Sequence, residues 1–304
     1  MKITGNPTIA AWYSASRPRT LTATYAPLGV AAAVAIQDEV FKLVPFVLAL
    51  IGVLFLQVAA NLINEYFDYT RGADKLKEAG QGMTIKKRIL SPRAVLAGAV
   101  ITVVAGALIG VYLLSQSGPL LWWIGIGGVL VVITYTAGPF PLAYNGLGEI
   151  AVGIFMGPMI IIGAYYVMDT AVYWELALIS LPIAFMVAAI LHANNIRDME
   201  ADRAVNKRTL AVMFGVGLAR AEYTFLVGGA YLALVALVIA EQTPALTLLA
   251  LLTAREGIAL IHIIYTRTDT PSLHEVQGRT AKLHGQFALM MVVGWLIGLT
   301  AQAL

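Results

Sequence analysis

The sequence predicts an all-α protein whose chain crosses a membrane nine times. Hydrophobic residues make up 59% of its 304 residues and charged residues only 12%, whereas soluble domains average roughly 45–50% and 25%. Apolar stretches long enough to cross a bilayer as helices recur along the whole chain. The absence of cysteine excludes a disulfide framework and thiol chemistry. We expect one transmembrane domain over residues 1–304.

The predicted spans follow one another with short polar or Gly/Pro breaks between them. The first span contains Pro27 and follows a basic leader, which we interpret as preceding an uncleaved span rather than forming a signal peptide, because another span follows at once. Gly138, Pro139 and Pro141 separate the fourth span from the fifth. The nine spans are residues 21–36, 44–63, 94–115, 119–136, 148–168, 173–193, 217–240, 244–266 and 284–303.

The positive charges predict the orientation of the chain. All but two of the 20 lysines and arginines fall in the N-terminal segment and in the loops after the even-numbered spans. The exceptions are Lys42, on the opposite side, and Arg255, inside the eighth span. Because basic loops stay in the cytoplasm, we expect a multi-pass cell-membrane protein with its N-terminus inside and its C-terminus outside.

Two polar motifs stand at the cytoplasmic ends of the second and sixth spans. Residues four apart on a helix lie on one face, with Cβ atoms about 5–6 Å apart, so each motif aims its amide and carboxylate groups at one place. Two such stripes on one side of the membrane suggest two halves of a single site. The residues are Asn64, Asp68 and Asp74 in the first motif and Asn194, Asp198 and Asp202 in the second.

These carboxylates repel one another unless a cation lies between them. Oxygen ligands suit Mg²⁺, which proteins usually bind through one or two carboxylates together with substrate phosphates. No Gly-x-x-x-x-Gly-Lys-Ser/Thr loop is present, so a nucleoside triphosphatase is not indicated. A lipid diphosphate fits better, with its head among the carboxylates and its tail between helices, although the carboxylates could instead be helix-end charges. The basic candidates for phosphate contact are Arg71, Lys75, Lys86, Lys87, Arg197, Lys207 and Arg208.

Several motifs together resemble the UbiA superfamily of intramembrane aromatic prenyltransferases. They are residues 15–21, 61–74, 135–141, 147–149 and 194–210. Within the superfamily they are most similar to enzymes that prenylate 1,4-dihydroxy-2-naphthoate in menaquinone biosynthesis. The resemblance implies a UbiA-type bundle of nine helices with cytoplasmic cap loops, in agreement with the span count.

The resemblance also implies roles for individual residues. Two Mg²⁺ ions would bridge the two motifs to the diphosphate, with Asn195 alongside the second motif. One departure is Glu65, where the pattern usually has Asp, which casts doubt on a metal role there. The implied metal ligands are Asp68, Asp74, Asp198 and Asp202.

The implied reaction transfers a polyprenyl group from a polyprenyl diphosphate to 1,4-dihydroxy-2-naphthoate, with release of diphosphate and CO₂, to give demethylmenaquinone. Tyr135 and Tyr144 are candidates to stabilise an allylic cation, or else belong to an interfacial aromatic belt. Arg17 and Arg19 either pair with the acceptor carboxylate or set the topology. Membrane lipid forms the surroundings, and no nucleic-acid partner is expected.

Alternatives remain at this stage. The same fold can act on 4-hydroxybenzoate, homogentisate or a glycerol lipid, and intramembrane carboxylates also occur in cation-coupled transporters. His192 is either a packed histidine or an acid–base group. Arg255 and Glu256 either form a structural ion pair or line the cavity for the tail.

Overall fold

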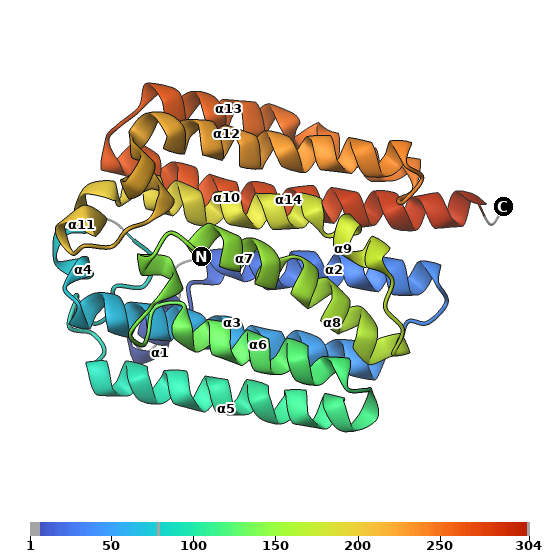
Figure 1. The fold of residues 1–304 in the computed structure, drawn as a ribbon, viewed down its shortest axis with the longest axis horizontal. Helices are drawn as coiled ribbons and strands as arrows, with labels where there is room; N and C mark the ends of the chain where they lie inside the picture. Colours follow the sequence, from blue (N-terminus) through green and yellow to red (C-terminus); the bar gives the residue numbers. More distant parts are fainter. Residues whose placement is uncertain (1–6, 78–79, 303–304) are drawn as a thin grey trace.

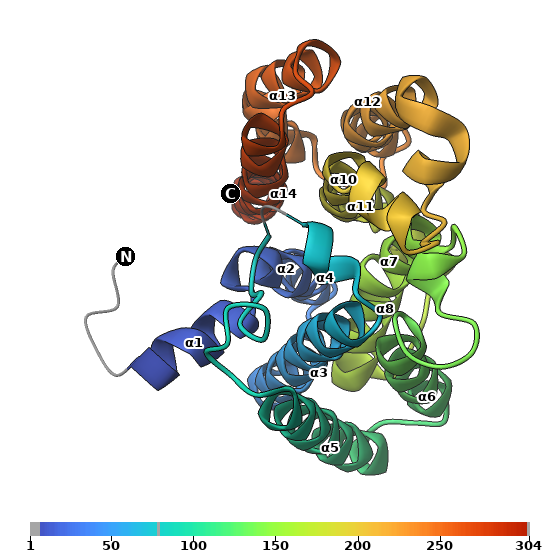
Figure 2. The same cartoon turned by 90° about the vertical axis from the view of Figure 1, so that its left-hand side faces the viewer.

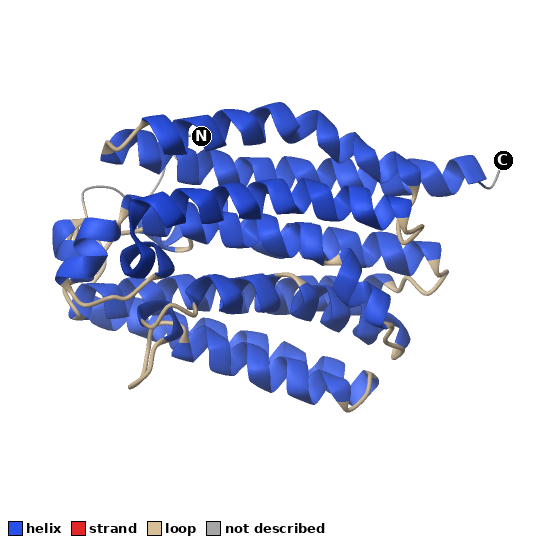
Figure 3. Ribbon diagram, turned by 45° about the horizontal axis from the view of Figure 1, so that its top comes forward, coloured by secondary structure: helices blue, strands red, loops and turns tan. Residues whose placement is uncertain are grey.

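The computed structural model describes residues 7–77 and 80–302. Within this part the chain is a bundle of helices without a strand (Figure 3). The elements are α1 (Pro7–Ala15), η1 (Pro18–Leu21), α2 (Thr22–Gln37), α3 (Leu43–Thr70), α4 (Ala73–Leu76), α5 (Pro92–Gln116), α6 (Leu120–Thr134), η2 (Leu142–Tyr144), α7 (Gly148–Met156), α8 (Pro158–Asp169), α9 (Trp174–Ile179), α10 (Leu181–Arg197), α11 (Met199–Ala204), α12 (Leu210–Ile239), η3 (Ala245–Thr253), α13 (Ala254–Thr266) and α14 (Thr270–Gln302).

The long helices run side by side along the molecule, and the short helices α4 and α11 lie together at one end (Figures 1 and 2). We call this end the site end, because both predicted motifs lie there. In the described part, eight helical stretches are long and apolar enough to cross a membrane. The predicted all-α, polytopic fold is therefore confirmed.

The predicted fourth span, residues 119–136, is the shorter helix α6. Its 15 residues rise about 22 Å, less than the roughly 30 Å hydrocarbon core. The helix starts after Pro119 and gives way to a loop before Gly138, whose φ is 84°. This accounts for the difference between nine predicted spans and eight of full length.

The fifth predicted span, residues 148–168, is confirmed as one membrane-spanning stretch, Gly148–Asp169, although it consists of two helices, α7 and α8. They break at Gly157, where a Cβ atom would lie 2.7 Å from the Cβ of Ala184. The last helix starts at Thr270 rather than residue 284, because its polar first turns pack inside the protein, with Gln277 and Thr280 buried. Polar composition concealed this part of the helix from a prediction based on hydropathy.

The main core lies among α2, α8, α10, α12 and α14. Its largest fully buried side chains include Trp295, Tyr165, Tyr223 and Phe287. The outward faces are also apolar, and Trp123 is 76% exposed. A surface of this kind is stable only when it faces lipid or another protein, as expected of a multi-pass membrane protein.

Candidate active site

The structure brings the two predicted motifs together at the site end. The first motif occupies the last turns of α3 and the short helix α4, and the second occupies the end of α10 and α11. Helix α4 packs against α11, which joins the two halves (Figure 2). The four carboxylates of the motifs are nearly inaccessible: Asp68, Asp74, Asp198 and Asp202 are all buried.

Lys77 connects the two carboxylates of the first motif. Its Nζ lies 2.8 Å from Oδ2 of Asp68 and 3.4 Å from Oδ1 of Asp74. Burial lowers the pKa of Lys77, but the nearby Asp68 and Asp198 more than offset this, so the pKa is raised and the ammonium stays charged. The hydroxyl of Tyr144 donates to the other oxygen of Asp68 at 2.9 Å.

Arg197 connects the second motif in the same way. Its guanidinium donates to both oxygens of Asp198, at 2.7 Å each, and to Oδ1 of Asn194 at 2.6 Å. A third nitrogen lies 3.0 Å from Nδ1 of His274 on α14. Arg197, predicted to contact the phosphate, is thus bound to the protein's own carboxylate in this structure.

Asp202 is the most deeply buried of the four carboxylates. It is fully buried, and neither oxygen accepts a hydrogen bond from the described residues. Burial raises the pKa of Asp202 to about 6, although Lys207, whose Nζ lies 3.4 Å from Oδ1, acts to lower it. The oxygens of Asp202, together with those of the nearby Asp198, form a set of ligands that suits a divalent cation.

Lys207 and Tyr144 span the gap between the motifs. The Lys207 Nζ lies 5.4 Å from the centroid of the Tyr144 ring, and the guanidinium carbon of Arg71 lies 4.7 Å from the same centroid. Burial lowers the pKa of Lys207, but Asp68 and Asp202, one from each motif, raise it overall. Lys207 therefore interacts electrostatically with carboxylates of both motifs.

The remaining predicted basic residues divide into two groups. Arg17 lines the cavity described below, and its guanidinium donates to Oδ1 of Asn64 at 2.9 Å. Arg71 donates to the carbonyl oxygen of Gly138 at 3.0 Å and so holds the loop before η2. Lys86 donates to the carbonyl oxygen of Lys77 at 2.6 Å.

Arg19, Lys87 and Arg208 do not line the cavity. Arg19 is exposed and lies near Gly278 of α14, where a Cβ atom would be 3.3 Å from its Nη1. Lys87 and Arg208 are exposed, although the backbone of Arg208 donates to the Tyr144 carbonyl. The side chain of Lys75 lies outside the described residues.

Glu65 and Asn195 have structural partners. Oε1 of Glu65 accepts hydrogen bonds from the hydroxyl of Thr84 at 2.6 Å and the backbone N–H of Ile85 at 3.0 Å. Glu65 thus holds the loop that follows α4, in keeping with the doubt about a metal role. Asn195 donates to Oε1 of Glu149 at 2.8 Å.

His192 is a packed histidine in this structure. Nδ1 lies 3.0 Å from Oε1 of Glu149, and Nε2 lies 2.8 Å from the carbonyl oxygen of Ala219. Its side chain is fully buried. Both ring nitrogens are therefore engaged by protein acceptors, which favours the structural interpretation over the acid–base one.

Arg255 and Glu256 do not pair with each other or line the cavity. Glu256 instead accepts from Arg279 on α14, at 2.8 and 3.0 Å. Arg255 is exposed. The ion pair between Glu256 and Arg279 therefore connects α13 to α14.

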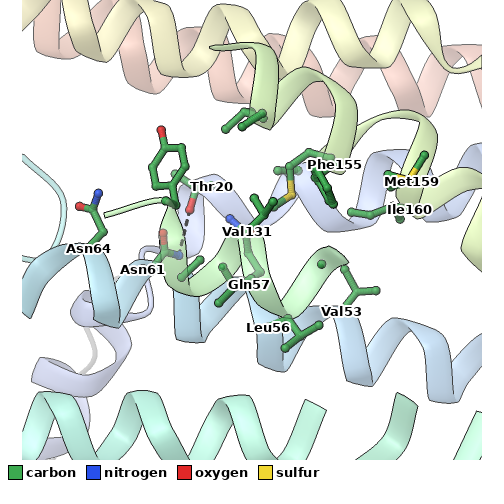
Figure 4. Close-up of a pocket in the computed structure, with 18 of the residues that line it drawn as sticks. Thr20, Val53, Leu56, Gln57, Asn61, Asn64, Val131, Phe155, Met159 and Ile160 are labelled. Carbon is green, nitrogen blue, oxygen red and sulfur yellow. Dashed lines mark hydrogen bonds between the residues drawn. The ribbon is translucent and has the colours of Figure 1, made fainter. Parts of the chain in front are cut away.

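A long cavity of about 560 Å³ opens from the motifs into the bundle. It extends along α3 from Asp68 to Ala49, nineteen residues that rise about 28 Å. Its walls come mainly from α3, α5, α6, α7, α8 and α10 and are mostly apolar, as Figure 4 shows around Val131 and Phe155. Tyr135 lines it near the motifs. The shape suits an extended hydrocarbon chain whose polar head stays among the carboxylates.

Lys77 and His274 were missed by the sequence reasoning. Lys77 was counted only as a loop charge, although its position three residues after Asp74 was a usable signal. His274 was hidden because it lies on a part of α14 that was not predicted to be helical.

Comparison with known proteins agrees with this geometry. Residues 25–283 match the UbiA prenyltransferase family. A 1,4-dihydroxy-2-naphthoate octaprenyltransferase of Bacillus subtilis is 36% identical over 203 residues, which cover 66% of this chain and 64%, just under two thirds, of that relative. The Haemophilus influenzae protein of the same name is 28% identical over 96% of this chain and 98% of its own length.

Solved structures share the fold. A UbiA homolog from Archaeoglobus fulgidus bound to DMAPP and Mg²⁺ aligns with a TM-score of 0.65 at 15% identity, over 93% of this chain and 99% of that one. The apo UbiA homolog from Aeropyrum pernix K1 gives a TM-score of 0.69 at 17% identity, over 91% of this chain and 98% of that one. By its sequence over residues 25–283 and by its fold, the chain belongs to the UbiA prenyltransferase family.

Proposed function

We propose that the protein transfers a polyprenyl group from a polyprenyl diphosphate to 1,4-dihydroxy-2-naphthoate, with release of diphosphate and CO₂, to give the hydroquinone form of demethylmenaquinone. The observation that carries the proposal is the pair of carboxylate motifs at the mouth of a long apolar cavity. Relatives at 28–36% identity bear the name of this activity, which supports the choice of acceptor.

The carboxylates are suited to hold Mg²⁺ together with the diphosphate. Asp68, Asp74, Asp198 and Asp202 would be ligands. The clearest sign of fit is that neither oxygen of the buried Asp202 accepts a hydrogen bond from the described residues. We propose two ions, one for each motif. When bound, Mg²⁺ would neutralise charge that develops on the leaving diphosphate. Lys77 lies between the carboxylates, where its ammonium can donate to a phosphate oxygen.

The protein's own residues then orient the reactants. The apolar cavity holds the isoprenoid tail and excludes water from the allylic carbon. When the C1–O bond breaks, its electron pair leaves with the diphosphate, and the Tyr135 ring faces the cation. The acceptor carbon that bears the carboxyl group bonds to C1, and the C–CO₂ electron pair then restores aromaticity as CO₂ leaves. Arg17, which lines the cavity, would bind the acceptor carboxylate.

An acceptor assay tests this function. Purified protein in detergent, with Mg²⁺ and one prenyl diphosphate, is expected to prenylate 1,4-dihydroxy-2-naphthoate in preference to 4-hydroxybenzoate and homogentisate. Product formation is followed by mass, together with release of CO₂. Product from another acceptor, with none from the naphthoate, would overturn the proposal.

We propose further that the site end lies in the cytoplasm, because the lysine- and arginine-rich loops lie there. The chain has no cysteine, so single cysteines can report the topology. Lys87→Cys at the site end is expected to react with a membrane-impermeant maleimide only in inverted vesicles or permeabilised cells. Lys42→Cys, before α3 at the opposite end, is the matched control and should react in intact cells. The reverse pattern would contradict the orientation.

Binding of Mg²⁺ should weaken at low pH. A pKa of about 6 for Asp202 means that about nine-tenths of this carboxyl is protonated at pH 5, and a metal must displace that proton. We expect the Mg²⁺ concentration that half-saturates the rise in melting temperature to be about tenfold higher at pH 5 than at pH 7.5. Asp202→Asn should remove most of this pH dependence. An equal half-saturating concentration at both pH values in the unmodified protein would exclude Asp202 as a ligand.

A further inference from the structure

Arg197 has every N–H group of its guanidinium engaged by the protein. A guanidinium carries five such donors and no acceptor. Nε and Nη2 donate to the two oxygens of Asp198 at 2.7 Å each, and Nη2 also donates to Oδ1 of Asn194 at 2.6 Å. Nη1 lies 3.0 Å from Nδ1 of His274 and donates to Oε1 of Gln277 at 3.4 Å, the longest of these contacts. The side chain is only 2% exposed, so these groups take the place of solvent around it.

A guanidinium whose donors are all used is poorly suited to bind a phosphate, because it must first give up a contact. Asp198, by contrast, keeps room for a metal. A carboxylate offers about four lone-pair sites, and Arg197 occupies one on each oxygen. A metal ion can therefore bind Asp198 while Arg197 stays in place. Carboxylate ligands in metal sites are commonly oriented by an outer hydrogen-bond partner of this kind.

His274 reaches this arrangement from a different helix. Arg197 is the last residue of α10, whereas His274 lies in the first turns of α14, which packs against α10 (Figure 2). Because the guanidinium can only donate, Nδ1 of His274 is the acceptor, and the ring proton lies on Nε2. Arg197 and Asp198 line the cavity, but His274 does not. His274 therefore acts on the site through Arg197.

We propose that His274 is a positioning residue for the second motif: its Nδ1 fixes the guanidinium of Arg197, which in turn orients Asp198 as a ligand for Mg²⁺. The inference rests on the proposed function, in which Asp198 binds the metal. It assigns Arg197 to the metal ligand rather than to the phosphate, and it gives the polar first turns of α14 a role in the site. Neither residue takes part in bond making.

Two substitutions of His274 separate the hydrogen-bond acceptor from the volume of the side chain. Asn places its Oδ1 where histidine has Nδ1, whereas Gln places its Oε1 close to where histidine has Nε2. The measurement is a Mg²⁺ titration at fixed pH, followed by the rise in melting temperature with an unreactive geranyl thiolodiphosphate present. We expect His274→Leu and His274→Gln to raise the half-saturating Mg²⁺ concentration about three- to tenfold, as loss of one hydrogen bond does. His274→Asn should recover most of the affinity.

Variants of Arg197 test whether His274 acts through it. Arg197→Lys keeps the charge but loses the fork of donors, and we expect it to raise the half-saturating Mg²⁺ concentration about 10- to 100-fold. Adding His274→Leu to Arg197→Lys should then have little further effect, because both changes remove the same contact. A loss of thiolodiphosphate affinity in Arg197→Lys at saturating Mg²⁺, with an unchanged Mg²⁺ requirement, would place Arg197 on the phosphate and overturn the proposal.

His262→Leu is the matched control, because His262 on α13 is exposed and does not line the cavity; it should leave the Mg²⁺ requirement unchanged. A packing role would favour His274→Gln, the closer match in size, over His274→Asn. Equal effects of these two variants, or no effect of His274→Leu, would overturn the proposal alone. No response of the unmodified protein to Mg²⁺ would overturn the proposed metal-dependent function and this inference with it. Since no acceptor is present, the test does not depend on which acceptor the protein uses.

Discussion

Asp68→Asn and Asp198→Asn are each expected to lower prenyl transfer about 10³-fold, at the upper end of what removal of one charge-stabilising group costs. Asn keeps the shape of the side chain, so each variant should still accept hydrogen bonds from Lys77 or from Arg197. What is lost is the negative charge that holds a cation against the diphosphate. The measurement is single-turnover transfer at saturating donor, which reports on the chemical step.

Substitution by Ala would be a weaker test. It would leave the buried ammonium of Lys77 or the guanidinium of Arg197 without a counter-charge, and removal of one partner of a buried pair is strongly destabilising. Asp38→Asn is a suitable control, because Asp38 accepts a hydrogen bond from Tyr165 in the main core and away from the motifs. Normal turnover in Asp68→Asn or in Asp198→Asn would exclude that residue from the role given to it here.

Much of this site was predictable because its residues follow helical spacing. The interval of four from Asn64 to Asp68, and from Asn194 to Asp198, requires only that both segments be helical near their ends, which they are. The orientation of the spans then required both motifs to emerge on one side. Their convergence is therefore a consequence of local periodicity and topology.

The partners within the site were less predictable. Lys77 reaches Asp68 because the chain reverses after α3 at Gly72, whose φ is 82°. Arg197 was expected to face the substrate, but it is held by Asp198, its neighbour in sequence. Contacts of this kind depend on loop conformation and side-chain rotamers, which hydropathy and spacing do not encode.

The predicted helix boundaries were accurate where a span was uniformly apolar and wrong where polar residues are buried. The first turns of α14 contain Gln277 and Thr280, which have partners inside the protein: Gln277 accepts from Arg197, and Thr280 bonds to Tyr223. In a bundle with a polar site at one end, helices continue past the apolar region to supply such groups. Hydropathy therefore locates the membrane-spanning part better than the full helix.

Filling the cavity is expected to change the length of donor that the protein accepts. Gly128 on α6 lines the cavity, and a Cβ atom built there meets no atom within 4 Å. Gly128→Leu therefore places a side chain in the volume assigned to the tail, while it raises helix propensity. We expect kcat/KM for an octaprenyl donor to fall about 10²-fold, the range that steric mismatch in an apolar pocket produces, and that for geranyl diphosphate to change less than about threefold.

The contrast between the two donors, rather than the loss alone, identifies the cavity as the tail site. A general defect in folding or in metal binding would lower both values by the same factor. Gly228→Leu on α12 is the matched control, because a Cβ atom there also meets no atom within 4 Å and the residue does not line the cavity; it should leave both donors unaffected. If Gly128→Leu leaves kcat/KM unchanged for both the long and the short donor, the tail must leave the site by another route, between helices and into the lipid, and the length of this cavity would have no bearing on donor choice.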